Sequence, residues 1–115
     1  MPATVLGGTV MTRLEQLAEF ARVNPRDPFP RYGFALELKG QGRLEESADA
    51  FAALATDFPD YCPAYLHAGN VLVALHRSDE AASVYRAGIV AATKSRDNHA
   101  RGELESALAE LAVAE

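Results

Sequence analysis

Residues 28–95 read PFPRYGFALELKGQGRLEESADAFAALATDFPDY followed by CPAYLHAGNVLVALHRSDEAASVYRAGIVAATKS. The second half repeats features of the first at a constant spacing. Leu38 corresponds to Leu72 in this way, and Phe51 corresponds to Tyr85. A fixed period of about 34 residues indicates that one structural unit is used more than once.

The apolar residues from Thr12 onward recur three and four positions apart, which is the spacing of one face of a helix. Six short helices are predicted on this basis. Their apolar stripes are Leu14, Leu17, Ala18 and Ala21; Phe34, Ala35 and Leu38; Ala48, Phe51, Ala52 and Ala55; Leu66, Gly69, Leu72 and Val73; Ala81, Val84, Tyr85 and Gly88; and Leu104, Leu108 and Leu111.

Helix boundaries follow from turn and capping residues. Thr12 and Glu15 have the spacing of a capping box, and Asp27 before Pro28 predicts the start of the second helix. The other predicted boundaries are Asn24-Pro25, Gly40 with Gly42, Phe58-Pro59-Asp60, Pro63, Ser78 as the cap of the fifth helix, and Asp97 or Asn98 as the cap of the sixth.

This arrangement resembles the tetratricopeptide repeat family, in particular its small bacterial members. The matching positions are Phe34, Ala35, Leu38, the turn 42–46, Phe51 and Pro59 in residues 28–61, and Tyr65, Ala68, Gly69, Leu72, Asp79-Glu80-Ala81 and Tyr85 in residues 62–95. The departures are Arg31 in place of the usual Trp, Ser47 and Gly88 in place of Ala, and Thr93 in place of Pro.

The resemblance implies an all-α superhelix of antiparallel helix pairs. Its two full repeats, 28–61 and 62–95, are flanked by a half-unit, 12–27, and a capping helix, 96–115. These parts form a single domain. Residues 1–11 are expected to be a flexible tail, because Gly7 and Gly8 interrupt any pattern there.

Composition excludes several classes of function. The net charge of −5 argues against binding to nucleic acid or to an anionic membrane surface. Cys62 is the single cysteine, and the N-terminus lacks the charged start and long apolar centre of a secretory signal. We therefore expect a cytoplasmic protein with no membrane-spanning segment.

No catalytic, cofactor-binding or metal-binding residue is predicted, and the protein is not expected to be an enzyme. His67, His76 and His99 include no pair with the i, i+4 spacing of two metal ligands on a helix. Cys62 precedes Pro63 at a helix start, where the dipole can activate a thiol, but an inert, modestly buried cysteine is the favoured interpretation.

The predicted function is binding of a peptide or helical segment of another protein, on the concave face made by the first helix of each repeat. The candidate residues are Phe29, Tyr32, Leu36, Lys39, Leu66, His67, Asn70, Val73, Arg101 and Leu104. Some of them are alternatively expected to pack against neighbouring helices.

The resemblance implies a backbone-holding role for the Asn70 amide. Tyr32 and Leu66 stand where one subgroup of the family has the basic residues that clamp a C-terminal carboxylate. A partly hydrophobic segment is therefore expected, with Lys39 and Arg101 answering an acidic residue on it.

Two alternative functions remain open at this point. Phe20 and Val23 of the half-unit have no partner nearby in the sequence, so this end could form a homodimer in a structural or scaffold protein. A chaperone of the secretion type is a more remote alternative that no residue selects.

Overall fold

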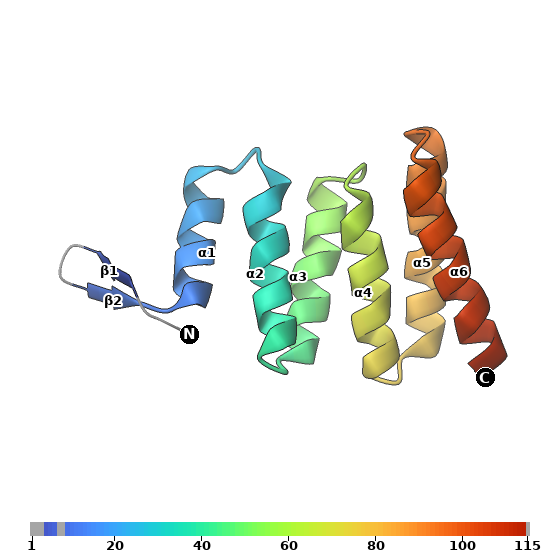
Figure 1. The fold of residues 1–115 in the computed structure, drawn as a ribbon, viewed down its shortest axis with the longest axis horizontal. Coiled ribbons are helices and arrows are strands. Elements are labelled where there is room, and N and C mark those ends of the chain that lie inside the picture. The colour runs from blue at the N-terminus through green and yellow to red at the C-terminus, as the bar shows by residue number, and fades with distance from the viewer. Residues whose placement is uncertain (1–3, 7–8, 115) are drawn as a thin grey trace.

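The computed structural model describes residues 4–6 and 9–114, and in them six helices follow one another along the molecule (Figure 1). They are α1 (Arg13–Val23), α2 (Pro28–Gly40), α3 (Leu44–Asp57), α4 (Cys62–Ala74), α5 (Ser78–Lys94) and α6 (Asn98–Ala114). Each helix packs against the next, so the predicted superhelix of antiparallel pairs is confirmed.

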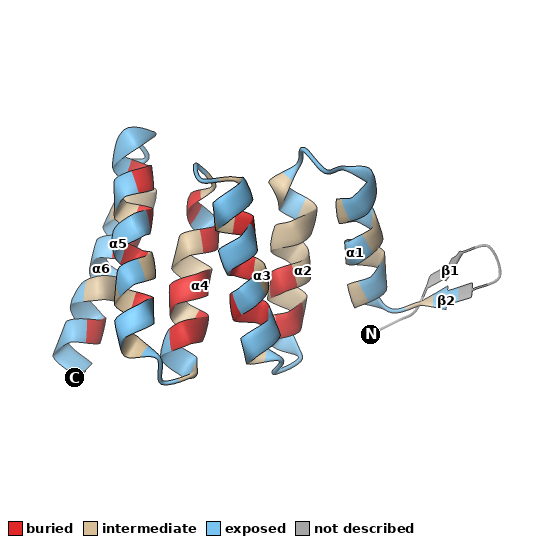
Figure 2. Ribbon diagram, turned by 180° about the vertical axis from the view of Figure 1, so that it is seen from behind, coloured by how far each residue is buried: buried red, intermediate tan, exposed pale blue. Residues whose placement is uncertain are grey.

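The helices form two layers. Helices α2, α4 and α6 lie on the near side in Figure 1, whereas α3 and α5 are nearest the viewer in Figure 2. The molecule measures 51 × 29 × 19 Å. The face made by α2, α4 and α6 is the one that the sequence predicts to bind a partner.

The first two helices begin as predicted. The Thr12 hydroxyl accepts a hydrogen bond of 3.1 Å from the Glu15 amide, and the Glu15 carboxylate accepts one of 3.0 Å from the Thr12 amide. The Asp27 carboxylate likewise accepts from the Phe29 amide at 3.0 Å. These bonds satisfy backbone donors that have no partner within the helix.

The start of α5 differs from the prediction. Arg77 is its N-cap, and Ser78, predicted to cap this helix, is already its first helical residue. The carbonyl of Arg77 accepts the hydrogen bond from the Ala81 amide, so the hydroxyl of Ser78 lies one position too late to cap. At α6 the Asp97 carboxylate accepts from the Ala100 amide at 3.0 Å, as predicted.

Small residues allow the helices to approach closely. A Cβ atom built on Gly69 would lie 2.6 Å from Cδ1 of Tyr85, so the tyrosine ring rests directly on the α4 backbone. A Cβ on Gly88 would lie 2.6 Å from Cβ of Tyr65. Both glycines are therefore required by packing between α4 and α5.

The departure from the family pattern at Ser47 also has a structural reason. This residue is completely buried, and its hydroxyl donates a hydrogen bond of 2.8 Å to the carbonyl of Ala35. A buried hydroxyl is tolerated when it is hydrogen-bonded, and here it ties α3 to α2.

The N-terminal segment contains two strands where the sequence pattern predicts only a flexible tail. Strand β1 (Thr4–Leu6) pairs antiparallel with β2 (Thr9–Met11), with Val5 opposite Val10. The sequence does contain a hairpin signal here, because β-branched residues lie on both sides of a Gly-Gly dipeptide of the kind found in hairpins. The predicted flexibility also concerns residues 1–3 and 7–8, which lie outside the described residues.

None of the described helices is both long enough and apolar enough to span a lipid bilayer.

Candidate partner-binding site

A groove runs between α4 and α6 on the predicted binding face. Its volume is about 660 Å³. We call it the α4–α6 groove, and its lining residues are Leu66, Asn70, Asn98, His99, Gly102, Glu103, Ser106, Ala107 and Glu110. A smaller pocket of about 320 Å³ adjoins it, shares Leu66, His99 and Glu103 with it, and adds Tyr32 and His67.

Asn70 lies in the α4–α6 groove with its amide held in one orientation. Its Oδ1 accepts a hydrogen bond of 2.6 Å from the hydroxyl of Tyr85 on α5. Tyr85 is itself fixed, because it is buried against Gly69. Among the described residues Tyr85 is the one hydrogen-bond partner of this side chain, so the two Nδ2 hydrogens of Asn70 are left to donate to a ligand.

The α4–α6 groove is acidic. Glu103 and Glu110 both line it, and no Lys or Arg does. His99 on the preceding turn places Nε2 3.3 Å from Oε1 of Glu103. A cationic group in this groove would meet two carboxylates, whereas an anionic group would be repelled.

An aromatic cluster supports the neighbouring part of the face. The Tyr32 hydroxyl lies 3.1 Å from Nε2 of His67, so a polar contact joins α2 to α4. The ring of His67 is stacked on Phe51 with 5.6 Å between centroids and 19° between planes. Tyr32 also meets Tyr61 edge-on at 5.7 Å. Tyr32 and His67 thus serve the packing of the helices as well as the surface.

Burial lowers the pKa of the His67 imidazole, and the positive charge of Lys39 lowers it further, against a smaller opposing effect of Glu103. The neutral ring is therefore the favoured form. Its Nδ1 atom is buried and has no hydrogen-bond partner among the described residues.

A second groove, of about 560 Å³, lies between α1 and α2. We call it the α1–α2 groove, and its lining residues are Arg13, Leu17, Phe20, Asn24, Phe29, Pro30, Tyr32, Gly33, Leu36 and Glu37. The predicted residues therefore divide between two places. Phe29 and Leu36 belong to the α1–α2 groove, Leu66 and Asn70 belong to the α4–α6 groove, and Tyr32 reaches both sides of α2.

Lys39 and Val73 line neither groove. Lys39 is half-buried and close enough to His67 to influence its pKa, and Val73 is exposed near the end of α4. Their predicted contact with a partner stays a prediction.

Two predicted site residues on α6, Arg101 and Leu104, lie outside the α4–α6 groove. Leu104 is only 1% exposed and packs against Gly88, so it is mainly a core residue, and it lines the adjoining pocket rather than the α4–α6 groove. Its predicted contact with a partner stays a prediction. Arg101 lines neither groove, and its Nε lies 3.9 Å from Oε1 of Glu105 along the same helix. The groove is instead lined by His99 and Glu103 of α6 and, further along this helix, by Ser106, Ala107 and Glu110.

The error has a simple cause in the spacing of the helices. Helix α4 begins one full repeat period after α2, but α6 begins two positions later than the same period would place it. The main reason is that α5 has 17 residues where α3 has 14. A strict repeat period therefore predicts the wrong residues of α6 to face the groove. The capping residue Asp97 was the sequence signal that could have corrected it.

Nothing in the described residues favours a reactive or metal-binding centre. Burial raises the pKa of the Cys62 thiol, which makes this cysteine less reactive. In the described part of the chain no three His, Cys, Asp or Glu side chains are grouped so that they could hold a metal ion.

Several solved structures share this arrangement of helices. A solution structure of a tetratricopeptide repeat domain protein from Salinibacter ruber is 31% identical, with a TM-score of 0.75 over 79% of this chain and 92% of that one. The chain belongs to the tetratricopeptide repeat family. A crystal structure of a tetratricopeptide repeat domain protein from the same bacterium is 30% identical, with a TM-score of 0.72 over 77% of this chain and 100% of that one.

A solution structure of a protein from Bordetella parapertussis shares the fold with a TM-score of 0.75, covers 90% of both chains, and is 18% identical. No protein-family model and no curated protein matches the sequence. Tetratricopeptide repeats are generally modules of protein–protein interaction, which gives the class of function but no partner.

Proposed function

We propose that this tetratricopeptide repeat protein binds a segment of a partner protein in the α4–α6 groove and its adjoining pocket. The main support for binding at this place is the Asn70 amide, which Tyr85 holds in one orientation. Because Tyr85 occupies its oxygen, the amide offers two hydrogen-bond donors to the groove. Main-chain carbonyls of a peptide are the acceptors that such donors suit.

The charges of the groove define the ligand further. Glu103 and Glu110 favour a segment that carries Lys or Arg, and Leu66 offers it an apolar contact. This revises the expectation of an acidic residue answered by Lys39 and Arg101, since neither of these cations lines the groove.

The test begins with random peptides displayed on phage and selected against the wild-type protein. Affinities of the selected peptides are then measured by fluorescence anisotropy. We expect Asn70→Ala to weaken binding about tenfold, which corresponds to ~1.4 kcal/mol. Gln41→Ala, which removes an exposed amide at the end of α2, is the matched control. Equal affinity of Asn70→Ala and wild type would contradict the proposal.

Two double variants test whether the negative charge of the groove attracts the peptide. Glu103→Gln with Glu110→Gln removes two negative charges from the groove, and Glu45→Gln with Asp49→Asn removes two from exposed positions on α3. Only the first pair should weaken binding and flatten its dependence on salt. An equal loss in both pairs would show that net charge alone attracts the peptides.

A further inference from the structure

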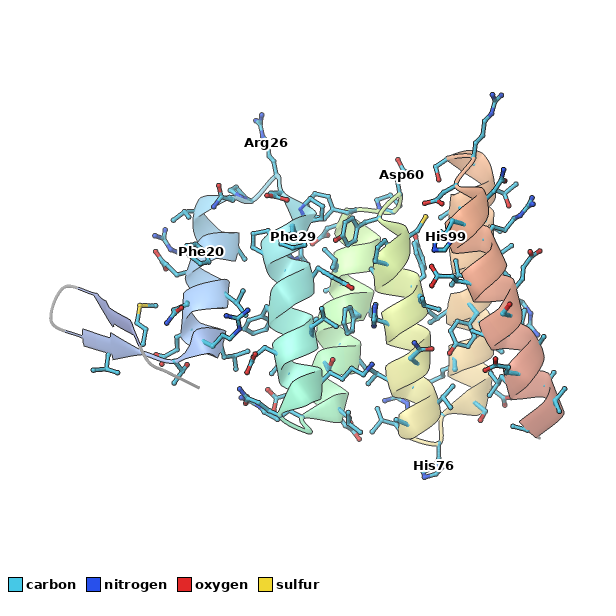
Figure 3. All side chains as sticks on the ribbon, in the orientation of Figure 1. Phe20, Arg26, Phe29, Asp60, His76 and His99 are labelled. Carbon is cyan, nitrogen blue, oxygen red and sulfur yellow. The ribbon has the colours of Figure 1, made fainter. Side chains whose placement is uncertain are left out.

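The adjoining pocket lies where α4 and α6 begin. These two helices run in the same direction and pack against each other, so their N-terminal ends lie at the same end of the molecule (Figure 1). His99 marks this end of α6 in Figure 3. The pocket is lined by residues of both helices and by Tyr32 of α2. Three helices thus enclose a space of about 320 Å³ beside the α4–α6 groove.

The inner part of this pocket is apolar. Leu104 of α6 is 1% exposed and yet lines the pocket, so the pocket reaches down to the hydrophobic core. Leu66 and Tyr32 are half-buried and contribute further apolar surface. Such walls suit a ligand group with an uncharged stem of several carbon atoms.

The rim of the pocket is negatively charged. Asp97 and Glu103 both line the pocket and both are exposed, whereas no Lys or Arg lines it. Oδ1 of Asp97 accepts the capping hydrogen bond from the Ala100 amide. Oε1 of Glu103 lies 3.3 Å from Nε2 of His99. Among the described residues neither Oδ2 of Asp97 nor Oε2 of Glu103 has a hydrogen-bond partner, so each carboxylate has one oxygen left for a ligand.

The ends of the helices do not cancel this charge. The N-terminus of a helix carries about half a positive charge, and α4 and α6 both begin at the pocket. Together they supply about one positive charge, against the two negative charges of Asp97 and Glu103. Lys39, whose charge acts on His67, does not line the pocket. The pocket as a whole therefore attracts a cation.

Lys and Arg are the side chains that match an apolar interior with an acidic rim. Each has an aliphatic stem that can cover Leu66 and Leu104, and a cationic end that can reach the carboxylates. The ring of Tyr32 offers the cation a further favourable contact. The side chains of Asp and Glu would be repelled. An apolar side chain would cover the carboxylates without pairing them, which costs free energy.

A segment bound in the α4–α6 groove can place such a side chain in the pocket. The pocket and the groove share Leu66, His99 and Glu103. Leu66 lies four residues before Asn70 on α4, which is about 6 Å along the helix. A ligand residue next to the one that the Asn70 amide holds is therefore close enough to extend its side chain into the pocket.

We propose that the adjoining pocket is the specificity pocket of the peptide site, and that it holds one Lys or Arg side chain of the partner, with the cationic end paired to Asp97 and Glu103. This inference rests on the function proposed above for the source of that side chain. It adds a role for Asp97, which does not line the α4–α6 groove. Glu110 lines the groove but not the pocket, so it attracts a basic segment without selecting one side chain.

The first test needs no peptide. Amide shifts of the ¹⁵N-labelled protein are recorded as N-acetyl-arginine methylamide is added at constant low ionic strength and at about pH 7.5, where an ordinary histidine is mostly uncharged. We expect saturable shifts at Leu66, Ala100 and Glu103, which line the pocket. The citrulline analogue has nearly the same shape without the charge, and it should bind about tenfold more weakly, since each of two exposed ion pairs contributes about threefold. Equal shifts with both probes, or none with either, would overturn the proposal.

A matched pair of variants locates the charge. Asp97→Asn keeps a residue that can cap α6 and removes one carboxylate from the pocket. Asp27→Asn makes the same change at the cap of α2, where the residue is exposed and lines neither the pocket nor either groove. Asp97→Asn should weaken binding of the arginine probe about threefold, and Asp27→Asn should leave it unchanged. An equal effect of the two substitutions would overturn the assignment to this pocket.

The selected peptides distinguish failure of this proposal from failure of the proposed function. Replacing one Lys by norleucine, or one Arg by citrulline, should weaken each peptide about tenfold, and Asp97→Asn should reduce that preference about threefold. If Asn70→Ala weakens a peptide but Asp97→Asn leaves its preference for a cation unchanged, the specificity pocket is wrong and the groove remains. If the arginine probe binds as expected but Asn70→Ala weakens no peptide, the proposed function is wrong and the pocket remains.

Discussion

The hydroxyl of Tyr85 donates a hydrogen bond of 2.6 Å to Oδ1 of Asn70, and it thereby links the packing core to the α4–α6 groove. The tyrosine ring is buried against Gly69, while its hydroxyl reaches the edge of the groove. One side chain thus performs two separable tasks, filling space and orienting an amide.

Tyr85→Phe separates these two tasks. The ring still packs against Gly69, so the free energy of unfolding should fall by no more than about 1 kcal/mol, the usual net value of one hydrogen bond. The Asn70 amide loses its fixed orientation, so selected peptides should bind several-fold more weakly. Anisotropy and urea unfolding measure the two effects. Unchanged affinity with unchanged stability would show that orientation of the amide is unimportant.

Substitution by alanine is expected to have opposite effects on stability at Gly69 and Gly102. Gly69→Ala forces a Cβ against the Tyr85 ring and should lower the free energy of unfolding by ~1–3 kcal/mol. Gly102→Ala lies inside the N-terminal part of α6, where a Cβ atom would meet nothing within 4 Å, and helix propensity should make it stabilising by about 0.5–1 kcal/mol. Chemical unfolding of both variants gives the comparison. The same sign in both would contradict the packing of α5 on α4.

Leu104 offers a test of the corrected register of α6. Because this side chain is buried against Gly88, Leu104→Ala should cost ~2–5 kcal/mol of stability. Val113→Ala, at an exposed position on the same helix, should change stability by at most about 0.5 kcal/mol. Thermal unfolding followed by circular dichroism measures both. A small loss of stability in Leu104→Ala would show that this side chain is not buried in the core.

His67 predicts a dependence of stability on pH. Because burial lowers the pKa of its imidazole in the folded protein, the unfolded chain binds the proton more readily. The stability that His67 contributes to the folded protein is thus fully present above about pH 6.5, the pKa of an unfolded histidine. This stability is lost as the pH falls below that value.

The measurement compares melting temperatures at about pH 7.5 and pH 5.5, a window that lies above the ordinary pKa of carboxylates. The wild type should lose stability across it, and His67→Gln should lose less. His76→Asn is the control at an exposed histidine whose φ of 60° asparagine also accepts. If His76→Asn removes the pH dependence and His67→Gln does not, the assignment to His67 is wrong.

The fold could be predicted because its signals are local. The apolar stripes, the Thr12 capping box and the Asp27-Pro28 start each concern one helix, and helices form largely from neighbours in the sequence. The constant repeat period then predicted the packing of α2 to α5, where Gly69 meets Tyr85 as the repeat requires.

The site was less predictable because it depends on how distant helices meet. The extra length of α5 moves α6 by two positions, which brings Glu103 into the groove and sends Leu104 into the core. The bond between Tyr85 and Asn70 joins residues of different helices and leaves no mark in the sequence.

NMR titration can locate a bound peptide on the protein, and we expect it to lie in the α4–α6 groove. Amide shifts are recorded for the ¹⁵N-labelled wild type as a selected peptide is added. The largest shifts are expected at the Asn70 side-chain amide and along α6 near Glu103 and Ser106, because these residues line the groove. Shifts confined to α1, α3 or α5 would contradict it.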